Sequence, residues 1–208
     1  ELVCDRVRGV WEQTLQQTPV RAEFFRQLKK RLKGVLSVHP EFDQNIQARL
    51  SELSALDAEL EAPFSVLIHG DFNTDNLIIN TERPHVYMFD LHRTKEYDYL
   101  QDVSVFLVSN FRVPRFEPEV QERLDWVSKN FLGFARGFGK THGDETFDAR
   151  LAAGLARSFL TSTRFALDKA FAGEMHDRFE ALVSALEAHR GKPWAEFELD
   201  ESLILYNR

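Results

Sequence analysis

One change in the spacing of apolar residues, at Pro63, limits the folds open to this 208-residue chain. Before Pro63, apolar residues recur every three or four positions, which is the spacing of amphipathic helices. After it come three short apolar runs of strand length, at residues 64–68, 77–79 and 86–89. The helical spacing returns from about residue 98. The sequence therefore predicts a mainly α-helical, α+β domain with one small β element near its middle.

Three helices are expected before the strands. The first covers residues 3–15 and the third covers residues 42–60. Between them, Thr18-Pro19 has the form of an N-cap followed by proline at the first helical position, so the second helix is expected to begin there. The last segment, residues 194–208, is acidic and then apolar, and we expect it to dock against the helices. Core positions expected along the whole chain include Val7, Trp11, Phe24, Leu28, Leu32, Ile46, Leu50, Leu53, Val103, Phe106, Leu124, Trp126, Phe131, Leu155, Phe159, Phe179 and Leu182.

A β-hairpin is predicted where the second and third apolar runs flank the turn-like residues 80–84. If Asn80 pairs with Val86, the strands align so that Asn76 faces Asp90 just beyond the paired residues. Opposed residues of an antiparallel pair have Cβ atoms about 5 Å apart. An amide oxygen and a carboxylate would thus share a small volume. Such hard oxygen donors suit Mg²⁺ when phosphate oxygens and water complete its coordination.

The loop between the first two strands contains a second candidate for chemistry. Asp71 lies in this loop, at the same end of the β element as Asn76. A carboxylate beside a metal ion, but not needed as its ligand, can accept the proton of an attacking hydroxyl group. Asn73 and Asp75 are expected to shape the turn, because short polar side chains bond to nearby backbone groups. Arg93 is expected to pair with a carboxylate rather than with a phosphate. The alternative is that the whole stretch is an ordinary turn without chemistry.

The charge balance and the cysteine content limit the partners and the setting. A formal net charge of -7 argues against nucleic acid as a partner, because phosphate binding needs a basic surface. No apolar run approaches the roughly 18 to 20 residues of a membrane span. Cys4 is the only cysteine, so the chain has no disulfide framework. We expect a cytoplasmic protein with neither a nucleic acid nor a membrane partner. The acidic residues at 196–201 fit either a cationic substrate or a solvated surface.

The polar residues also give the chain a family resemblance. His-Gly-Asp at residues 69–71, followed by Asn76 and by Asp90 at the end of an apolar run, resembles the motif of the aminoglycoside phosphotransferase and choline kinase group. Further on, Asp98 and Asp102 lie where that family has Gly-Asp-Pro, two residues and Asp-Leu, with tyrosines in place of the glycine and the proline.

The resemblance implies a role for five residues. Asp71 would be the catalytic base, and Asn76 and Asp90 would be the magnesium ligands. Asp102 would be a carboxylate that braces the catalytic loop, and His69 would be a structural residue that holds it. The resemblance further implies a protein-kinase-like fold, Mg²⁺ as cofactor, and transfer of the γ-phosphoryl group of ATP or GTP to a hydroxyl group of a small molecule.

The resemblance covers a C-terminal lobe only. In kinase-like enzymes a glycine-rich loop, a strand lysine and its glutamate partner precede the catalytic loop and hold the nucleotide phosphates. Only some 68 residues precede His69 here, and they have helical spacing, so the N-terminal nucleotide lobe is absent from this sequence. We expect a single kinase-like lobe over residues 1–208, with a helical segment at 1–62, the catalytic loop and hairpin at 63–104, and a second helical segment with the tail at 105–208.

Two functions are compatible with such a lobe. In the first, it belongs to a longer kinase, supplies the base, the metal ligands and the substrate-binding helices, and is inactive as an isolated fragment. The alternative is a catalytically inactive kinase-like lobe that serves as a module for protein interaction.

Overall fold

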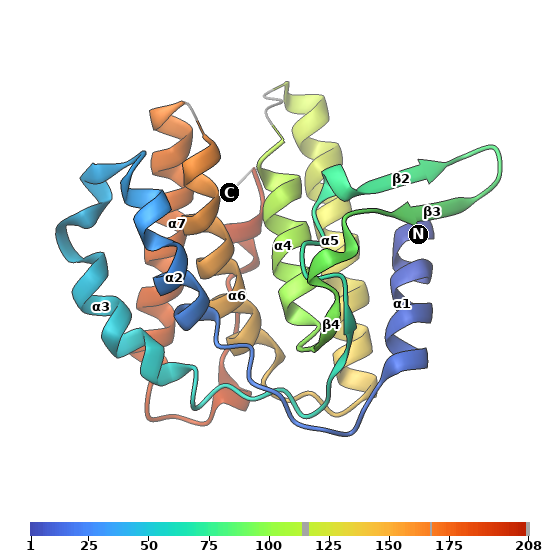
Figure 1. The fold of residues 1–208 in the computed structure, drawn as a ribbon, viewed down its shortest axis with the longest axis horizontal. Helices are drawn as coiled ribbons and strands as arrows, with labels where there is room; N and C mark the ends of the chain where they lie inside the picture. Colours follow the sequence, from blue (N-terminus) through green and yellow to red (C-terminus); the bar gives the residue numbers. More distant parts are fainter. Residues whose placement is uncertain (114–116, 167, 207–208) are drawn as a thin grey trace.

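The computed structural model describes residues 1–113, 117–166 and 168–206, apart from the side chains of residues 43–45 and 48. Over this part of the chain seven α-helices form one helical body, and a two-stranded hairpin projects from its side (Figure 1). The mainly helical fold predicted from the sequence is confirmed. None of these helices has the length and apolarity to cross a membrane. The helices are α1 (Leu2–Thr14), α2 (Phe24–Leu36), α3 (Asp43–Leu56), α4 (Leu100–Phe111), α5 (Pro118–Thr141), α6 (Phe147–Ser162) and α7 (Lys169–His189).

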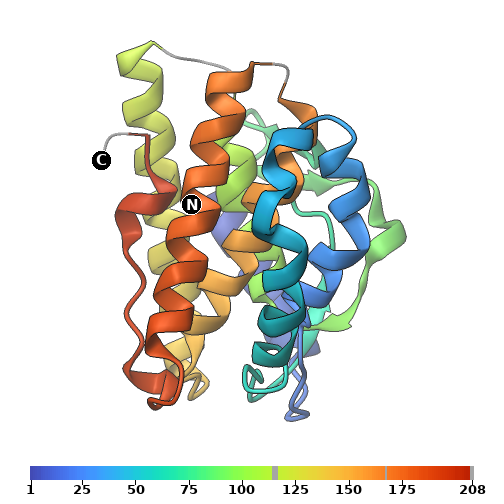
Figure 2. The same ribbon diagram turned by 90° about the vertical axis from the view of Figure 1, so that its left-hand side faces the viewer.

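Helix α6 is the centre of the packing. It contacts α2, α4 and α7, and every residue from Ala149 to Thr161 is buried. Seen from the side opposite the hairpin, α3, α2 and α7 form the near layer of helices (Figure 2). A Cβ atom added to Gly154 would lie 2.9 Å from the hydroxyl oxygen of Ser104 on α4 and 3.2 Å from the ring of Phe24 on α2. The absence of a side chain at Gly154 is therefore what allows these helices to approach so closely.

The second helix begins later than the sequence predicts. Residues 15–23 are not helical, because Gln16 and Val20 exchange backbone hydrogen bonds with Ser65 and Ala62, just before the first strand. Helix α2 starts at Phe24, and the carboxylate of Asp57 accepts hydrogen bonds from the N–H groups of the next two residues, at 3.1 and 2.9 Å. The prediction that the helix begins at Thr18-Pro19 is wrong because distant partners override the local capping signal.

The strands form two separate antiparallel pairs. Strand β1 (Val66–Ile68) pairs with β4 (Lys95–Tyr97), and β2 (Leu77–Asn80) pairs with β3 (His85–Met88) to form the hairpin. The sequence analysis did not predict β4. Its three residues are mostly exposed and polar, so they give no apolar signal of a strand.

The register of the hairpin differs by one residue from the prediction. Asn80 pairs with His85, not with Val86, and the N–H group of Phe89 donates to the carbonyl oxygen of Asn76 at 3.0 Å. The Oδ1 atom of Asn80 accepts the N–H groups of residues 82 and 83, both at 3.0 Å, which closes a tighter turn than expected. Asn76 therefore faces Phe89, and Asp90 lies one residue beyond.

The segment at residues 194–206 docks against the helices, as expected. Leu203 and Ile204 are buried, the N–H group of Tyr206 donates to Asp125 on α5 at 2.8 Å, and Glu201 pairs with Arg136 at 2.5 Å. Residues 207 and 208, which the prediction included, lie outside the described residues. Among the expected core positions, Trp126 was predicted wrongly, because it is 63% exposed.

Replacing Gly154 with alanine should lower the free energy of unfolding by about 1–3 kcal/mol, because the added methyl group overpacks the contact between α4 and α6. Gly133→Ala on α5 is the matched control: its Cβ atom would meet nothing within 4 Å, and alanine favours helix more than glycine does. Urea unfolding followed by circular dichroism measures both variants. Equal stabilities of the two variants would contradict the close approach.

Candidate active site

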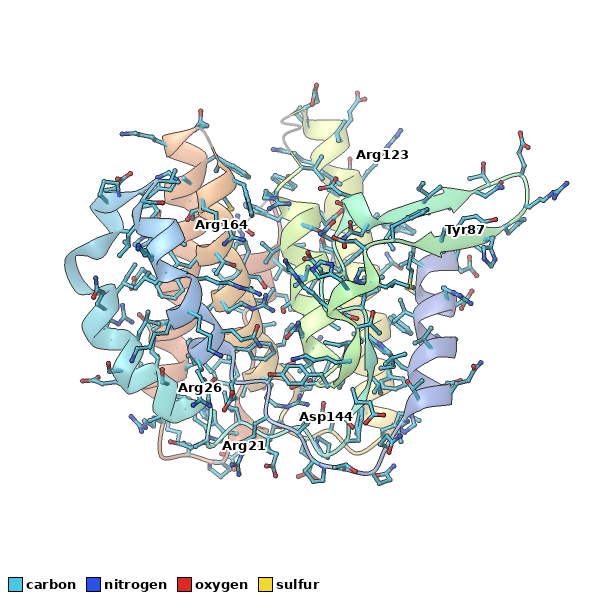
Figure 3. All side chains as sticks on the ribbon, viewed as in Figure 1. Arg21, Arg26, Tyr87, Arg123, Asp144 and Arg164 are labelled. Carbon is cyan, nitrogen blue, oxygen red and sulfur yellow. The ribbon has the colours of Figure 1, made fainter. Side chains whose placement is uncertain are left out.

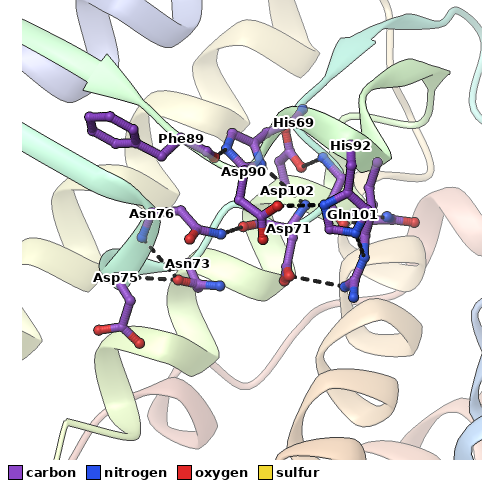
Figure 4. A network of polar contacts seen from close by, with 12 residues as sticks. His69, Asp71, Asn73, Asp75, Asn76, Phe89, Asp90, His92, Gln101 and Asp102 are labelled. Atoms are coloured by element: carbon purple, nitrogen blue, oxygen red, sulfur yellow. Dashed lines mark hydrogen bonds and ion pairs between the residues drawn. The ribbon is translucent and has the colours of Figure 1, made fainter.

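Three segments meet at one end of the β element and form the candidate active site (Figure 4). They are residues 69–76 between β1 and β2, residues 89–93 after β3, and the first turn of α4. The structure brings together here all five residues to which the resemblance gave a role, namely His69, Asp71, Asn76, Asp90 and Asp102.

The carboxylate of Asp102 ties the loop to α4. Its Oδ2 atom accepts the N–H group of His69 at 2.7 Å, and its Oδ1 atom accepts the N–H group of Gly70 at 2.8 Å. Asp102 is buried, and this burial raises its pKa to about 7, although the two N–H donors act in the opposite direction. The contacts are those that a residue bracing the catalytic loop would make.

The position of Gly70 requires glycine. Its φ angle is +84°, in the left-handed region that residues with a side chain rarely adopt. A Cβ atom at this position would lie 2.3 Å from the backbone oxygen of Arg93. The loop therefore passes directly against the segment that follows the hairpin, which brings Asp71 close to Arg93.

His69 connects the loop to the end of the hairpin. Its Nε2 atom lies 2.7 Å from the carbonyl oxygen of Phe89, and its Nδ1 atom lies 3.3 Å from the backbone nitrogen of Asp71. A carbonyl oxygen can only accept and an N–H group can only donate, so these two contacts fit the tautomer that carries its proton on Nε2. Both ring nitrogens are used in holding the loop, which supports a structural role for His69.

Asn76 and Asp90, the predicted magnesium ligands, lie side by side but not opposite each other. The Nδ2 group of Asn76 donates to the carbonyl oxygen of Asp71 at 2.9 Å, so its Oδ1 atom is the one available to a cation. Asp90 has a φ angle of +58°, which is uncommon outside glycine, and it accepts a hydrogen bond from Nδ1 of His92 at 2.5 Å. Such backbone strain often occurs at functional sites.

The donor set fits a magnesium ion that is shared with a substrate. Among the described residues, no group of three or more His, Cys, Asp or Glu side chains is placed to hold a metal ion. Asn76 and Asp90 offer one amide oxygen and one half-exposed carboxylate. Mg²⁺ commonly binds one or two carboxylates together with phosphate oxygens and water. The residues present thus fit Mg²⁺ that arrives with a phosphate ligand, better than a metal enclosed by protein.

Arg93 links the candidate base to the candidate metal ligand. Its Nη1 group donates to Oδ2 of Asp71 at 2.9 Å, and its Nε group donates to Nε2 of His92 at 3.1 Å. His92 in turn donates to Asp90. The expectation that Arg93 pairs with a carboxylate is confirmed. The guanidinium group thus connects the two acidic residues, directly to Asp71 and through His92 to Asp90.

Asn73 shapes the loop, as the sequence predicts. Its Oδ1 atom accepts the N–H groups of Asp75 and Asn76 at 3.0 and 3.2 Å and starts the short 3₁₀ helix over Thr74–Asn76. The same expectation for Asp75 is wrong: its carboxylate makes no such backbone bond among the described contacts, is 83% exposed, and lies 4.0 Å from Nη2 of Arg112. Asp75 is therefore a useful comparison for Asp71, because it is a carboxylate of the same loop that points away from the network.

The sequence left the role of Asp98 open, and the structure assigns it. This buried carboxylate accepts the N–H group of Leu100 at 2.9 Å, at the start of α4, and Nη1 of Arg150 at 2.5 Å. Arg150 also pairs with Asp144, which accepts the hydroxyl group of Tyr99 at 2.6 Å. This buried cluster fixes the start of α4 to α6, and so positions the helix that carries Asp102.

The sequence analysis missed a cavity of about 210 Å³ beside Asp71. Its lining includes Arg157 on α6 and Arg164 just after α6. A signal was present, because Arg150, Arg157 and Arg164 recur every seven residues in a segment that is otherwise rich in Ala, Leu and Phe. Such spacing places side chains along one stripe of a helix.

Replacing Asp102 with asparagine should destabilise the protein by about 1–3 kcal/mol, because an amide NH₂ group would face a loop N–H donor. The loss should also depend on pH. The pKa of Asp102 in the folded protein, about 7, lies above its ordinary value of 3.8, so the folded state holds the proton more tightly than the unfolded state. Wild-type stability should therefore fall as the pH rises from about 4 to about 7, and the variant should lack this component.

Denaturant titrations of both proteins across this pH range give the difference between their unfolding free energies. Asp57, whose pKa burial raises to about 6, titrates in both proteins and cancels from the difference. A difference that does not change with pH would contradict the assignment of the buried proton to Asp102.

Comparison with known proteins agrees with this geometry. Residues 11–138, more than half of the chain, match the phosphotransferase enzyme family. The matched range contains the loop, the hairpin and the first turn of α4. Searches of curated proteins and of solved structures give no significant match. The family match confirms the resemblance seen in the motif, and the chain belongs to the phosphotransferase enzyme family.

Proposed function

We propose that this chain is the catalytic and acceptor-binding lobe of an ATP- or GTP-dependent kinase that phosphorylates a hydroxyl group of a small molecule. The observation that carries the proposal is the position of Asp71. Its side chain is 27% exposed and borders a cavity, its carbonyl oxygen holds the amide of Asn76, and the preceding residues are fixed by Asp102. A cytoplasmic location, where nucleoside triphosphates are abundant, is part of the proposal.

The residues would divide the reaction as follows. The acceptor hydroxyl attacks the γ-phosphorus, and its proton passes to the carboxylate of Asp71. The bond between the γ-phosphorus and the bridging oxygen breaks, and the nucleoside diphosphate leaves. Mg²⁺ held by Asn76 and Asp90 would neutralise phosphate charge. Arg93 would contribute a further positive charge close to the transferred group.

The hairpin offers an apolar surface for the nucleotide base. Side chains alternate between the two faces of a strand, so Ile78 shares a face with Asn76, and Tyr87 shares that face with Phe89. These three apolar side chains are 55%, 49% and 47% exposed in that order, and Tyr87 lies on the outer part of the hairpin (Figure 3). An exposed apolar face next to the candidate metal ligands suits a flat base whose phosphates reach the metal.

The same face also favours the alternative function. Large exposed apolar side chains often mark a surface that binds another protein. Residues 1–68 contain no glycine-rich loop that could cover the phosphates. A catalytically inactive kinase-like lobe for protein interaction would keep the hairpin surface but would need neither the position of Asp71 nor that of Asp90.

Asp71→Asn should reduce phosphoryl transfer by at least about 100-fold, because a general base typically contributes 10²- to 10⁴-fold to the rate. Transfer of radiolabelled γ-phosphate to a panel of hydroxyl compounds, using the protein with all its natural domains, measures this. Asp75→Asn, which changes the exposed carboxylate of the same loop, should leave the rate within about twofold. Undiminished transfer by Asp71→Asn would refute the catalytic role, and a wild type that binds no Mg-nucleotide and transfers nothing would favour the interaction module.

A further inference from the structure

The cavity beside Asp71 is strongly cationic. It lies among α2, α4 and α6, and Arg164 at its rim stands next to α2 (Figure 3), where its Nη1 atom is 3.9 Å from the position of a Cβ atom on Gly34. Asp71 is the one acidic residue among the described residues that line it. Its described lining also contains five arginines, which are Arg31, Arg93, Arg112, Arg157 and Arg164.

Arg157 is a buried arginine that forms no ion pair with a carboxylate among the described residues. Only 3% of its surface is exposed. Its Nη2 group donates to Oγ of Ser104 at 3.3 Å, and its guanidinium lies 5.5 Å from the ring centre of Phe24. Its Nε group has no hydrogen-bond partner within the described part of the chain. The carboxylates of Asp71 and Asp102 attract the guanidinium, but neither lies within ion-pair distance of it. Burying an unpaired charge is costly, so a structural role alone does not account for Arg157.

The other two buried arginines among the described residues, Arg150 and Arg178, each form an ion pair with a carboxylate. Arg150 pairs with both Asp98 and Asp144. Arg178 pairs with Glu174 at 2.8 Å and donates to the carbonyl oxygen of Leu203 at 2.6 Å. Arg157 differs from both, because it is similarly enclosed and lines a cavity without forming an ion pair with any described carboxylate.

The surrounding groups add to the positive field and supply further donors. Burial, together with Arg31 nearby, lowers the pKa of Arg157 to about 9, so it is still a cation at neutral pH. The Nε group of Arg164 and the hydroxyl group of Ser158 are also buried without a hydrogen-bond partner in the described structure. Phe165, 59% exposed, lies at the rim with the guanidinium of Arg164 4.5 Å from its ring centre. Like charges gathered in a cavity repel one another, and an anion between them would relieve the repulsion.

We propose that this cavity binds the acceptor substrate through an anionic group, a carboxylate or a phosphate, so that the kinase acts on a small hydroxylated anion. The inference rests on the proposed function, since Asp71, beside which the acceptor hydroxyl would lie, is one of the lining residues. Arginine suits this task because its planar fork can hold two oxygens of one anion. The acidic segment at residues 196–201, which fits either a cationic substrate or a solvated surface, contributes none of the described lining residues.

Binding measured without nucleotide tests the proposal separately from catalysis. Titration calorimetry at constant ionic strength would compare four three-carbon or two-carbon alcohols that differ in charge: glycerol 3-phosphate, glycerate, glycerol and ethanolamine. Inorganic phosphate would serve as the minimal anion. The wild type should bind the anions at least tenfold more tightly than glycerol and ethanolamine. Equal or weaker binding of the anions would overturn the proposal.

Arg157→Met tests the anchor itself. It should weaken anion binding on the order of 10- to 100-fold, which corresponds to the loss of a charge-assisted hydrogen bond. Arg26→Met, which removes an exposed arginine of α2 that pairs with Glu23, is the control and should bind the anions as the wild type does. Unchanged anion binding by Arg157→Met would overturn the assignment.

Stability distinguishes a binding arginine from a structural one. Because Arg157→Met removes a buried unpaired charge, its thermal midpoint should be equal to or above that of the wild type. Arg150→Met should lower the midpoint, because it leaves two buried carboxylates without their partner. If Arg157→Met does not fold, Arg157 has a structural role and its assignment as the anchor fails. Arg164→Gln, at the partly exposed rim, then tests the cavity separately: weaker anion binding would support the anion site, and unchanged binding would overturn it.

The outcomes also separate this inference from the proposed function. If the anions bind through Arg157 but no phosphate is transferred to any hydroxylated anion, the anion site stands and the kinase function fails. If glycerol or ethanolamine is phosphorylated better than the anions, the kinase function stands and the anion site fails.

Discussion

The carboxylate of Asp102 holds the candidate active site together, because it accepts the N–H groups of two successive loop residues from within α4. The other contacts continue from this one. His69 reaches the carbonyl oxygen of Phe89, Phe89 donates to Asn76 across the hairpin, and the amide of Asn76 returns to Asp71. The candidate base and a candidate metal ligand thus belong to one closed ring of hydrogen bonds. Positioning of this kind is the main contribution that a protein can make to phosphoryl transfer.

Helix α6 carries both an arginine that is paired inside the fold and an arginine of the proposed anion site. Its seven-residue arginine spacing continues from Arg150, through Arg157, to Arg164 just beyond the helix. At one end Arg150 is neutralised by Asp98 and Asp144, which fixes the start of α4. At the other end the arginines line a cavity. Arg150 and the cavity-lining arginines of this series therefore differ in role because, of the three, only Arg150 pairs with described carboxylates, those of Asp98 and Asp144, from segments that meet its end of the helix.

The sequence predicted what depends on local pattern and missed what depends on distant contacts. Apolar spacing was sufficient for the helical fold, and the motif was sufficient for the family. The predicted start of α2 was wrong because Asp57, at the end of α3, caps the helix by accepting the N–H group of Phe25. The hairpin register was wrong because the side chain of Asn80 closes a tighter turn. The cationic cavity could not be located, since Arg31, Arg112 and Arg157 come from separate segments that meet only in the folded chain.

The arginines around Asp71 differ in how freely they can change partners. Arg157 is enclosed by α4 and α6, so it holds its position before any ligand arrives and is suited to anchor one. Arg93 has a side chain that is 46% exposed, and it is held by one contact with Asp71 and one with His92. Its ion pair with Asp71 is weak enough in this exposed setting to be exchanged for a phosphate. In the proposed reaction, a fixed cation for the acceptor and an exchangeable one beside the candidate base would let Asp71 become free to take a proton only when the phosphates are in place.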